Sequence, residues 1–149
     1  MAEVLLTDAA RIAADRFVVG AQWPRDHALY HPDQDGLSDP LLFAETIRQA
    51  LVYLAHRFYA VPLTHRFIGS RLDFRITDAA PLVVGPAPLP VTLEVEWVPV
   101  GNRPPHRFGM EVRATLMIAG KPCGDGRLVG VAVDDKRPVP SSAPASEGV

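Results

Sequence analysis

The feature that most constrains the fold is one long apolar segment, residues 39–59. Its apolar side chains would cover almost the whole circumference of a helix, which is typical of a helix buried in a core. Asp39 is the expected N-cap, Pro40 suits the first helical position, and Pro62 forbids continuation beyond the end. The segment therefore predicts one long helix around which the other elements must pack.

Three polar residues interrupt the apolar surface of this helix. Glu45, Arg48 and Gln49 are separated by three and four residues, so they share one stripe. A charge inside an otherwise buried helix is costly unless it is paired or used. The stripe is therefore the first candidate for a functional site.

The other apolar segments are predicted to be strands. Residues 17–23 form a strand that Pro24 ends, and residues 4–13 form either a strand or, near 10–14, a helical turn. After the helix the hydrophobic pattern has a period of two, which indicates half-buried strands. These are residues 67–76, 91–98, 106–118 and 126–133, with a loop at 25–38, a surface connection at 81–90 and a hairpin turn at 119–121.

One or two strands, a buried helix and then four strands in a meander predict an α+β fold. In such a domain the antiparallel sheet curls around the helix, which is the hotdog arrangement. We expect residues 1–135 to form this single domain and residues 136–149, rich in proline and serine, to form a disordered tail. Hotdog domains pair through their sheets, so a homodimer is expected.

The composition limits the class of protein. The 149 residues suit one domain, and 48% hydrophobic with 21% charged residues is ordinary for a soluble protein. A formal charge of −2 predicts neither nucleic acid nor a membrane as partner, and no segment approaches the roughly 20 apolar residues of a membrane span. Without a basic leader, and with Cys123 as its single cysteine, the chain is expected in the cytoplasm.

Two motifs carry a resemblance to a known family. The first lies in residues 18–27, where Trp23-Pro24-Arg25 is followed by His27, and the second in residues 39–50, where Glu45 precedes Arg48-Gln49. Together they resemble the A-factor biosynthesis hotdog family, the gamma-butyrolactone synthases of actinomycetes. The resemblance covers the first half of the chain well and the later strands by pattern. Typical members hold two hotdog repeats in tandem, and this chain resembles the first.

The resemblance implies an enzyme of secondary metabolism that acts on an acyl thioester of acyl carrier protein or coenzyme A. The implied reaction joins a β-ketoacyl group to dihydroxyacetone phosphate, and the ester later closes to a butenolide. The alternative is a dehydratase or related lyase acting on a β-hydroxyacyl or polyketide intermediate; thioester hydrolysis is a third reaction. A non-catalytic hotdog module that binds an acyl ligand, or has only a structural role, is the alternative from another class.

Glu45 is the expected catalytic acid–base group. The similar β-hydroxyacyl-carrier dehydratases place an acidic residue on this helix, and apolar surroundings favour the protonated carboxyl that general acid–base work needs. The competing interpretation is an ion pair with Arg48 or Arg25 that only braces the structure. Two histidines are candidates to act with it: His27, from the family-like motif, ranks before His31, which lies 14 residues ahead of Glu45.

Other polar and aromatic residues are candidates for binding the substrate. Gln49 would orient a thioester carbonyl, and Arg48 or Arg25 would hold a phosphate or carboxylate. Trp23 and Tyr30 would line an acyl tunnel or, as aromatics near a strand end, belong to the core.

The remaining titratable residues show no site pattern. His56 is interpreted as a core or interface histidine, and Cys123, predicted in a glycine-rich turn, as an unreactive thiol. The five histidines lack metal-ligand spacing, and no dinucleotide or phosphate-loop motif is present, so neither a metal nor a cofactor is expected.

Overall fold

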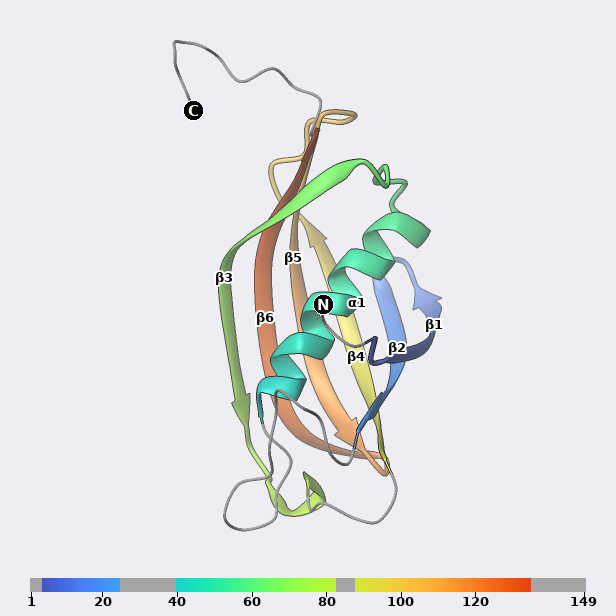
Figure 1. The fold of residues 1–149 in the computed structure, drawn as a ribbon, viewed down its shortest axis with the longest axis vertical. Helices are drawn as coiled ribbons and strands as arrows, with labels where there is room; N and C mark the ends of the chain where they lie inside the picture. The colour runs from blue at the N-terminus through green and yellow to red at the C-terminus, as the bar shows by residue number, and fades with distance from the viewer. Residues whose placement is uncertain (1–3, 25–39, 83–87, 135–149) are drawn as a thin grey trace.

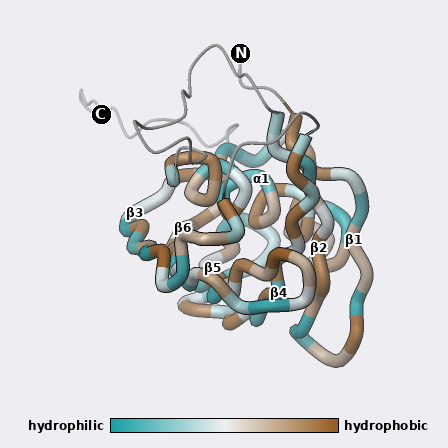
Figure 2. The backbone as a smooth tube through the Cα atoms, turned by 90° about the horizontal axis from the view of Figure 1, so that it is seen from below, coloured by the Kyte–Doolittle hydropathy of each residue, from teal (hydrophilic) through white to brown (hydrophobic). Residues whose placement is uncertain are grey.

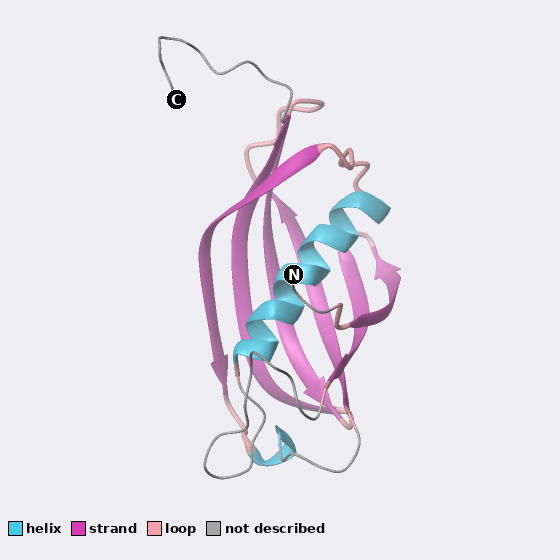
Figure 3. Cartoon of the chain, in the orientation of Figure 1, coloured by secondary structure: helices cyan, strands magenta, loops and turns pink. Residues whose placement is uncertain are grey.

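The structure is a computed structural model that describes residues 4–24, 40–82 and 88–134. Within these residues six strands form one antiparallel sheet, and helix α1 (Leu41–Phe58) lies across its concave face (Figures 1 and 3). The strands are β1 (Leu6–Ala13), β2 (Arg16–Trp23), β3 (His65–Ile76), β4 (Leu89–Pro99), β5 (Arg107–Ile118) and β6 (Lys121–Asp134). The predicted α+β hotdog fold is confirmed.

The order of the strands corrects one prediction. The sheet runs β1-β2-β4-β5-β6-β3, so only β4, β5 and β6 form a meander. Strand β3 follows the helix in sequence but pairs with β6 at the far edge, from His65 opposite Asp134 to Ile76 opposite Gly124. A period of two decides which face of a strand is buried but not which strand is its neighbour, and for this reason the prediction of a four-strand meander was wrong.

The ends of the first elements differ slightly from the prediction. Residues 6–13 are strand β1, so the helical turn near 10–14 is excluded. Helix α1 begins at Leu41 with Pro40 as its N-cap residue, one position later than predicted, and no side chain caps it. Asp39, the predicted cap, lies outside the described residues, as do residues 25–38, 83–87 and the tail 136–149.

The hairpin between β5 and β6 is confirmed at 119–121. Ala119 and Gly120 both have positive φ, 52° and 78°, which matches the twist of a tight two-residue hairpin. Strand β6 begins at Lys121, earlier than predicted. Cys123 therefore lies in a strand rather than in a turn, and its side chain is fully buried.

The core fills the space between the helix and the concave face of the sheet. Seen end-on, the strands form an arc around α1 (Figure 2). Alternate residues of β2, β4 and β5 point toward the helix and are buried, while their neighbours face outward. The largest fully buried side chains are Trp23, Phe17, Phe43, Ile47 and Leu54, and each contributes about 1.5–3 kcal/mol to folding. No helix among the described residues has the length and hydropathy to cross a membrane.

Candidate active site

The face of α1 turned away from the sheet is open, which corrects the expectation of a helix buried on all sides. Tyr53 on this face keeps 42% of its surface exposed. A groove of about 850 Å³ runs along it. Helix α1 contributes Glu45, Arg48, Gln49, Val52, Tyr53, His56 and Arg57, the N-terminal segment contributes Val4, Leu6, Thr7 and Asp8, and Leu63 completes the wall.

Glu45 and its two predicted neighbours form a connected group in this groove. Arg48 Nη1 donates to Glu45 Oε1 at 3.0 Å, and Gln49 Nε2 donates to Glu45 Oε2 at 3.2 Å. The Glu45 side chain is only 15% exposed, whereas that of Arg48 is 55% exposed. The predicted stripe therefore exists, and both carboxylate oxygens face polar hydrogens rather than bare apolar surface.

The backbone of a distant segment holds this group in place. The Leu5 N–H donates to Gln49 Oε1 at 2.8 Å, and the Leu5 carbonyl accepts from the Gln22 N–H at 2.9 Å. Leu5 itself is buried in the core. The stripe is thus fixed by a segment 44 residues away, a contact that sequence patterns alone did not reveal.

Trp23 lies in the core rather than on the groove. Its side chain is fully buried, and its Nε1–H donates to Thr46 Oγ1 at 2.8 Å. The Thr46 hydroxyl in turn donates to the Leu42 carbonyl at 2.6 Å. Of the two interpretations of Trp23, the structure agrees with the core residue. The other candidates, Arg25, His27, Tyr30 and His31, lie outside the described residues.

His56 is a groove residue that the sequence interpretation missed. Its Nδ1 lies 2.7 Å from the Val61 carbonyl oxygen, and its ring meets Phe67 edge-on at 5.2 Å between centroids. His56 follows Gln49 by seven residues and Glu45 by eleven, so all three share one stripe of the helix. That spacing was the signal that would have identified it.

An aromatic cluster holds the C-terminal end of α1 against the β1–β2 turn. The Tyr59 ring stacks on Trp97 at 4.4 Å between centroids, and its hydroxyl donates to the Asp15 carboxylate. Arg11 lies over the ring of Phe17 at 5.5 Å. Burial, and then the bond to Asp15, raise the pKa of Tyr59 well above its ordinary value of 10.0. The hydroxyl is therefore a structural donor, not an acid.

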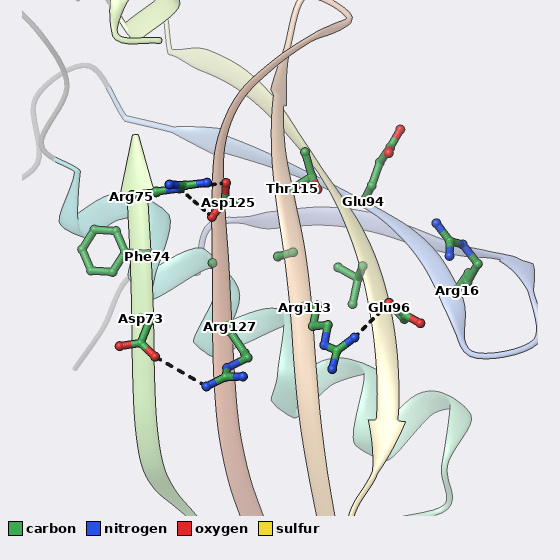
Figure 4. A pocket seen from close by; sticks show the side chains of 13 residues that line it. Arg16, Asp73, Phe74, Arg75, Glu94, Glu96, Arg113, Thr115, Asp125 and Arg127 are labelled. Carbon is green, nitrogen blue, oxygen red and sulfur yellow. Dashed lines mark hydrogen bonds and ion pairs between the residues drawn. The ribbon is translucent and has the colours of Figure 1, made fainter. Parts of the chain in front are cut away.

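The convex face of the sheet carries a second hollow, of about 430 Å³ (Figure 4). Four arginines and four carboxylates line it, and three of the arginines pair with carboxylates on neighbouring strands. Arg75 Nε lies 3.1 Å from Asp125, and Arg127 and Arg113 lie 3.9 Å from Asp73 and Glu96. Exposed pairs of this kind contribute little stability. Because the four positive and four negative side chains balance, the hollow presents no net charge to a ligand.

Cys123 and the histidines form no further site within the described residues. Burial raises the pKa of the Cys123 thiol, which keeps it protonated and unreactive. No group of three histidine, cysteine or acidic side chains there is arranged to hold a metal ion. The groove along α1 is therefore the candidate site that the structure favours.

Solved structures with low sequence identity share the fold. A point mutant of the fluoroacetyl-CoA-specific thioesterase FlK superposes with a TM-score of 0.59 at 16% identity over 86% of this chain and 91% of that one. S. sahachiroi AziG gives 0.52 at 18% identity, covering 86% and 90% of the two chains. A putative thioesterase from Shewanella oneidensis gives 0.55 at 11% identity, covering 84% and 82%. These likenesses establish the hotdog fold.

Sequence comparison is more specific. The "2-oxo-3-(phosphooxy)propyl 3-oxoalkanoate synthase" of Streptomyces virginiae is 34% identical over 164 residues, covering 99% of this chain and 55% of the relative. The synthase of the same name from Streptomyces griseus is 34% identical over 152 residues, covering 89% and 50%. The chain thus spans about half the length of the curated relatives it matches. The model of the A-factor biosynthesis hotdog domain matches residues 1–134, and the chain belongs to this family.

Proposed function

We propose that this protein is an enzyme that transfers a 3-oxoacyl group from a thioester to the hydroxyl of dihydroxyacetone phosphate. The observation that carries the proposal is Glu45, a largely buried carboxylate that lines an open groove. The relatives' name supports it, because a 2-oxo-3-(phosphooxy)propyl 3-oxoalkanoate is the ester that this transfer produces. The solved structures named thioesterases support a thioester as the substrate.

In the proposed reaction the hydroxyl oxygen of the acceptor attacks the thioester carbonyl carbon. A C–O bond forms, the C–S bond breaks, and the hydroxyl proton passes through Glu45 to the departing sulfur, which leaves as a thiol. No oxidant or reductant is needed. His27, or His31 in its place, would share the proton transfer.

The neighbours of Glu45 suit the two substrates. The Gln49 amide, 3.2 Å from Glu45 Oε2, would orient the thioester carbonyl beside the base. Arg48, whose guanidinium is exposed, would bind the phosphate of the acceptor together with Arg25. The amides at the N-terminus of α1, one turn before Glu45, would stabilise the negative charge that develops on the carbonyl oxygen.

A dehydratase is the second candidate function. Glu45 and a histidine would then remove water from a β-hydroxyacyl thioester, with no second substrate. The single observation in its favour is that Glu45 accepts hydrogen bonds from two donors, Arg48 and Gln49, and such a held carboxylate is enough for proton transfer at an acyl chain. A non-catalytic acyl-binding module is the remaining candidate.

Mass spectrometry on defined substrates separates these functions. The purified protein is incubated with a 3-oxoacyl thioester, with and without dihydroxyacetone phosphate, and with a 3-hydroxyacyl thioester. An ester that requires the phosphate supports the synthase, whereas loss of water from the hydroxyacyl substrate supports the dehydratase. Glu45→Gln should reduce turnover about 10²–10⁴-fold, the usual contribution of a general base.

The matched control for Glu45→Gln is Glu94→Gln. Glu94 is an exposed glutamate of β4 on the convex face, with no ion pair to the described residues, so its substitution should leave turnover unchanged. If acyl analogues bind but no substrate turns over, and Glu45→Gln changes nothing, the binding module is the correct function.

We also propose a homodimer that pairs through β3, in a cytoplasmic protein. Strand β3 is twelve residues long and lies at the sheet edge, with β6 as its single neighbour among the described strands. A long unpaired edge favours pairing with a further strand. Ile68 on this edge keeps 44% of its surface exposed.

A further inference from the structure

The groove along α1 has chemically different ends. Glu45, Arg48 and Gln49 line it toward the helix N-terminus, and His56 and Arg57 line it toward the C-terminus. The lining between and around these groups is mainly apolar, from Val4, Leu6, Val52 and Leu63. At a rise of 1.5 Å per residue, the twelve steps from Glu45 to Arg57 extend about 18 Å. A ligand that reacts at Glu45 and fills the groove therefore needs polar groups at its other end, to match His56 and Arg57.

His56 offers a hydrogen-bond acceptor at the second end. The Val61 carbonyl can only accept, so the Nδ1 atom 2.7 Å away carries the hydrogen. In the neutral ring Nε2 then keeps a free lone pair. Nε2 has no hydrogen-bond partner among the described residues. The buried atoms without a partner in this part of the chain do not include it, so it is not buried. It is thus a fixed acceptor, accessible on a residue that lines the groove.

Arg57 offers a cation at the same end of the groove. Its side chain is exposed, and its Cζ lies 5.0 Å from the centre of the Phe58 ring. Within the described part of the chain no carboxylate forms an ion pair with it, in contrast to Arg48, which pairs with Glu45 at 3.0 Å. An unpaired guanidinium and an acceptor at one end of the groove are complementary to a ligand that carries a phosphate and an amide N–H toward that end.

We propose that the groove binds the phosphopantetheine arm of the acyl thioester, with the sulfur near Gln49 and the phosphate at Arg57. The outer amide N–H of the arm donates to His56 Nε2. This inference rests on the proposed function, since it names how that thioester lies in the same site. The arm is common to coenzyme A and to acyl carrier protein.

The dimensions of the arm match those of the groove. Its thirteen bonds from sulfur to phosphorus extend about 15 Å, at the ~3.5 Å that an extended chain covers in three bonds. The outer amide nitrogen lies about 8 Å from the sulfur, and His56 lies about 10 Å beyond Gln49 along the helix. An acyl chain in the same place would leave the acceptor and the cation unused.

Binding of stable thioether analogues, measured by calorimetry, tests the proposal without requiring turnover. Three analogues share one acyl group and end in phosphopantetheine, pantetheine or N-acetylcysteamine, which lacks the outer amide. The phosphate should improve affinity about tenfold, as one charge-assisted contact does. We call the affinity for the phosphopantetheine analogue divided by that for the pantetheine analogue the phosphate ratio. Arg57→Gln should abolish the phosphate ratio and leave the affinity for the pantetheine analogue unchanged. The control Arg16→Gln, on the convex face, should alter neither quantity.

His56→Asn isolates the acceptor. An asparagine amide can still donate to the Val61 carbonyl, which preserves the local structure, but it lacks an acceptor at the position of Nε2. The preference for pantetheine over N-acetylcysteamine should fall about fivefold, the loss expected for one hydrogen bond. Binding of acyl-coenzyme A and of acyl carrier protein then identifies which molecule carries the arm. Arg57→Gln should weaken the binding of both. The natural carrier is the one that binds more tightly than acyl-phosphopantetheine.

The outcomes separate this inference from the proposed function. A phosphate ratio that is absent in the wild type, or unchanged by Arg57→Gln, overturns the binding mode even if the enzyme makes ester. If both affinity preferences, for phosphopantetheine over pantetheine and for pantetheine over N-acetylcysteamine, are found and depend on Arg57 and His56, the binding mode is supported. If no substrate turns over in the same protein, the proposed reaction is contradicted.

Discussion

The contact between Trp23 and Thr46 gives the sharpest test of how the core supports the site. Both side chains are fully buried, and the indole N–H has the Thr46 hydroxyl as its acceptor at 2.8 Å. Thr46→Val keeps the volume and replaces that acceptor with a methyl group. The Leu42 carbonyl keeps the Thr46 backbone N–H that every helix residue supplies to position i−4, so the indole alone loses its partner.

The expected cost follows from this asymmetry. A buried donor without an acceptor costs about 1–3 kcal/mol, so Thr46→Val should lower the free energy of unfolding by about 2 kcal/mol. In a Trp23→Phe background no indole N–H remains, and the added methyl group offsets the lost hydroxyl bond. Thr46→Val should then cost less than about 0.5 kcal/mol, which gives a coupling energy of roughly 1.5 kcal/mol.

Urea unfolding of the four proteins, followed by far-ultraviolet circular dichroism, measures this cycle. Thr115→Val is the matched control, because Thr115 lies half-buried on the outward face of β5 and its side-chain hydroxyl makes no hydrogen bond to the described residues. It should change stability by no more than about 0.5 kcal/mol. Equal costs of Thr46→Val in both backgrounds would refute the reasoning. If the folded Thr46→Val protein binds substrate with altered affinity, the interpretation of Trp23 as a residue of the acyl tunnel would be favoured instead.

Two further predictions concern the ends of the sheet. Because the pKa of Tyr59 is raised above 10.0 in the folded protein, the unfolded chain loses this proton first; the free energy of unfolding should therefore fall as pH rises above about 10. Tyr59→Phe should flatten that slope, and an unchanged slope would contradict the assignment. Light scattering should give twice the single-chain mass of 16.2 kDa, and Ile68→Lys, which places a charge on the β3 edge, should give single chains; a wild type of single mass would exclude the dimer.

The sequence predicted the local elements better than their arrangement. Alternation of apolar and polar residues in 91–98 and the apolar surface of 39–59 are local properties, and both elements are present. The position of β3 beside β6 depends instead on the path of the chain after α1, which no local period records. The start of β6 was predicted too late because Gly124 and Gly126 were interpreted as part of a turn. An added Cβ at these positions would meet Phe43 and Ile47, so the two glycines permit close packing against α1.

The same difference applies to the site. Helical spacing predicted that Glu45, Arg48 and Gln49 share a stripe, and it would have added His56 had the stripe been followed for two more turns. The bond from Leu5 to Gln49 joins residues 44 positions apart, and no pattern within one segment could predict it. Four further candidates, Arg25, His27, Tyr30 and His31, remain predictions because they lie outside the described residues.

The Leu5 contact also decides the orientation of the site. A backbone N–H can only donate, so the oxygen of the Gln49 side chain must face Leu5 and its NH₂ group must face Glu45. Glu45 Oε2 is therefore required to accept, which is the state in which a carboxylate can take a proton from a hydroxyl. Gln49 holds this acceptor in place from the core side, while Arg48 adds its charge from the solvent side. Under the proposed function, a substrate phosphate can engage Arg48 without displacing the bond that keeps Glu45 ready to act as the base.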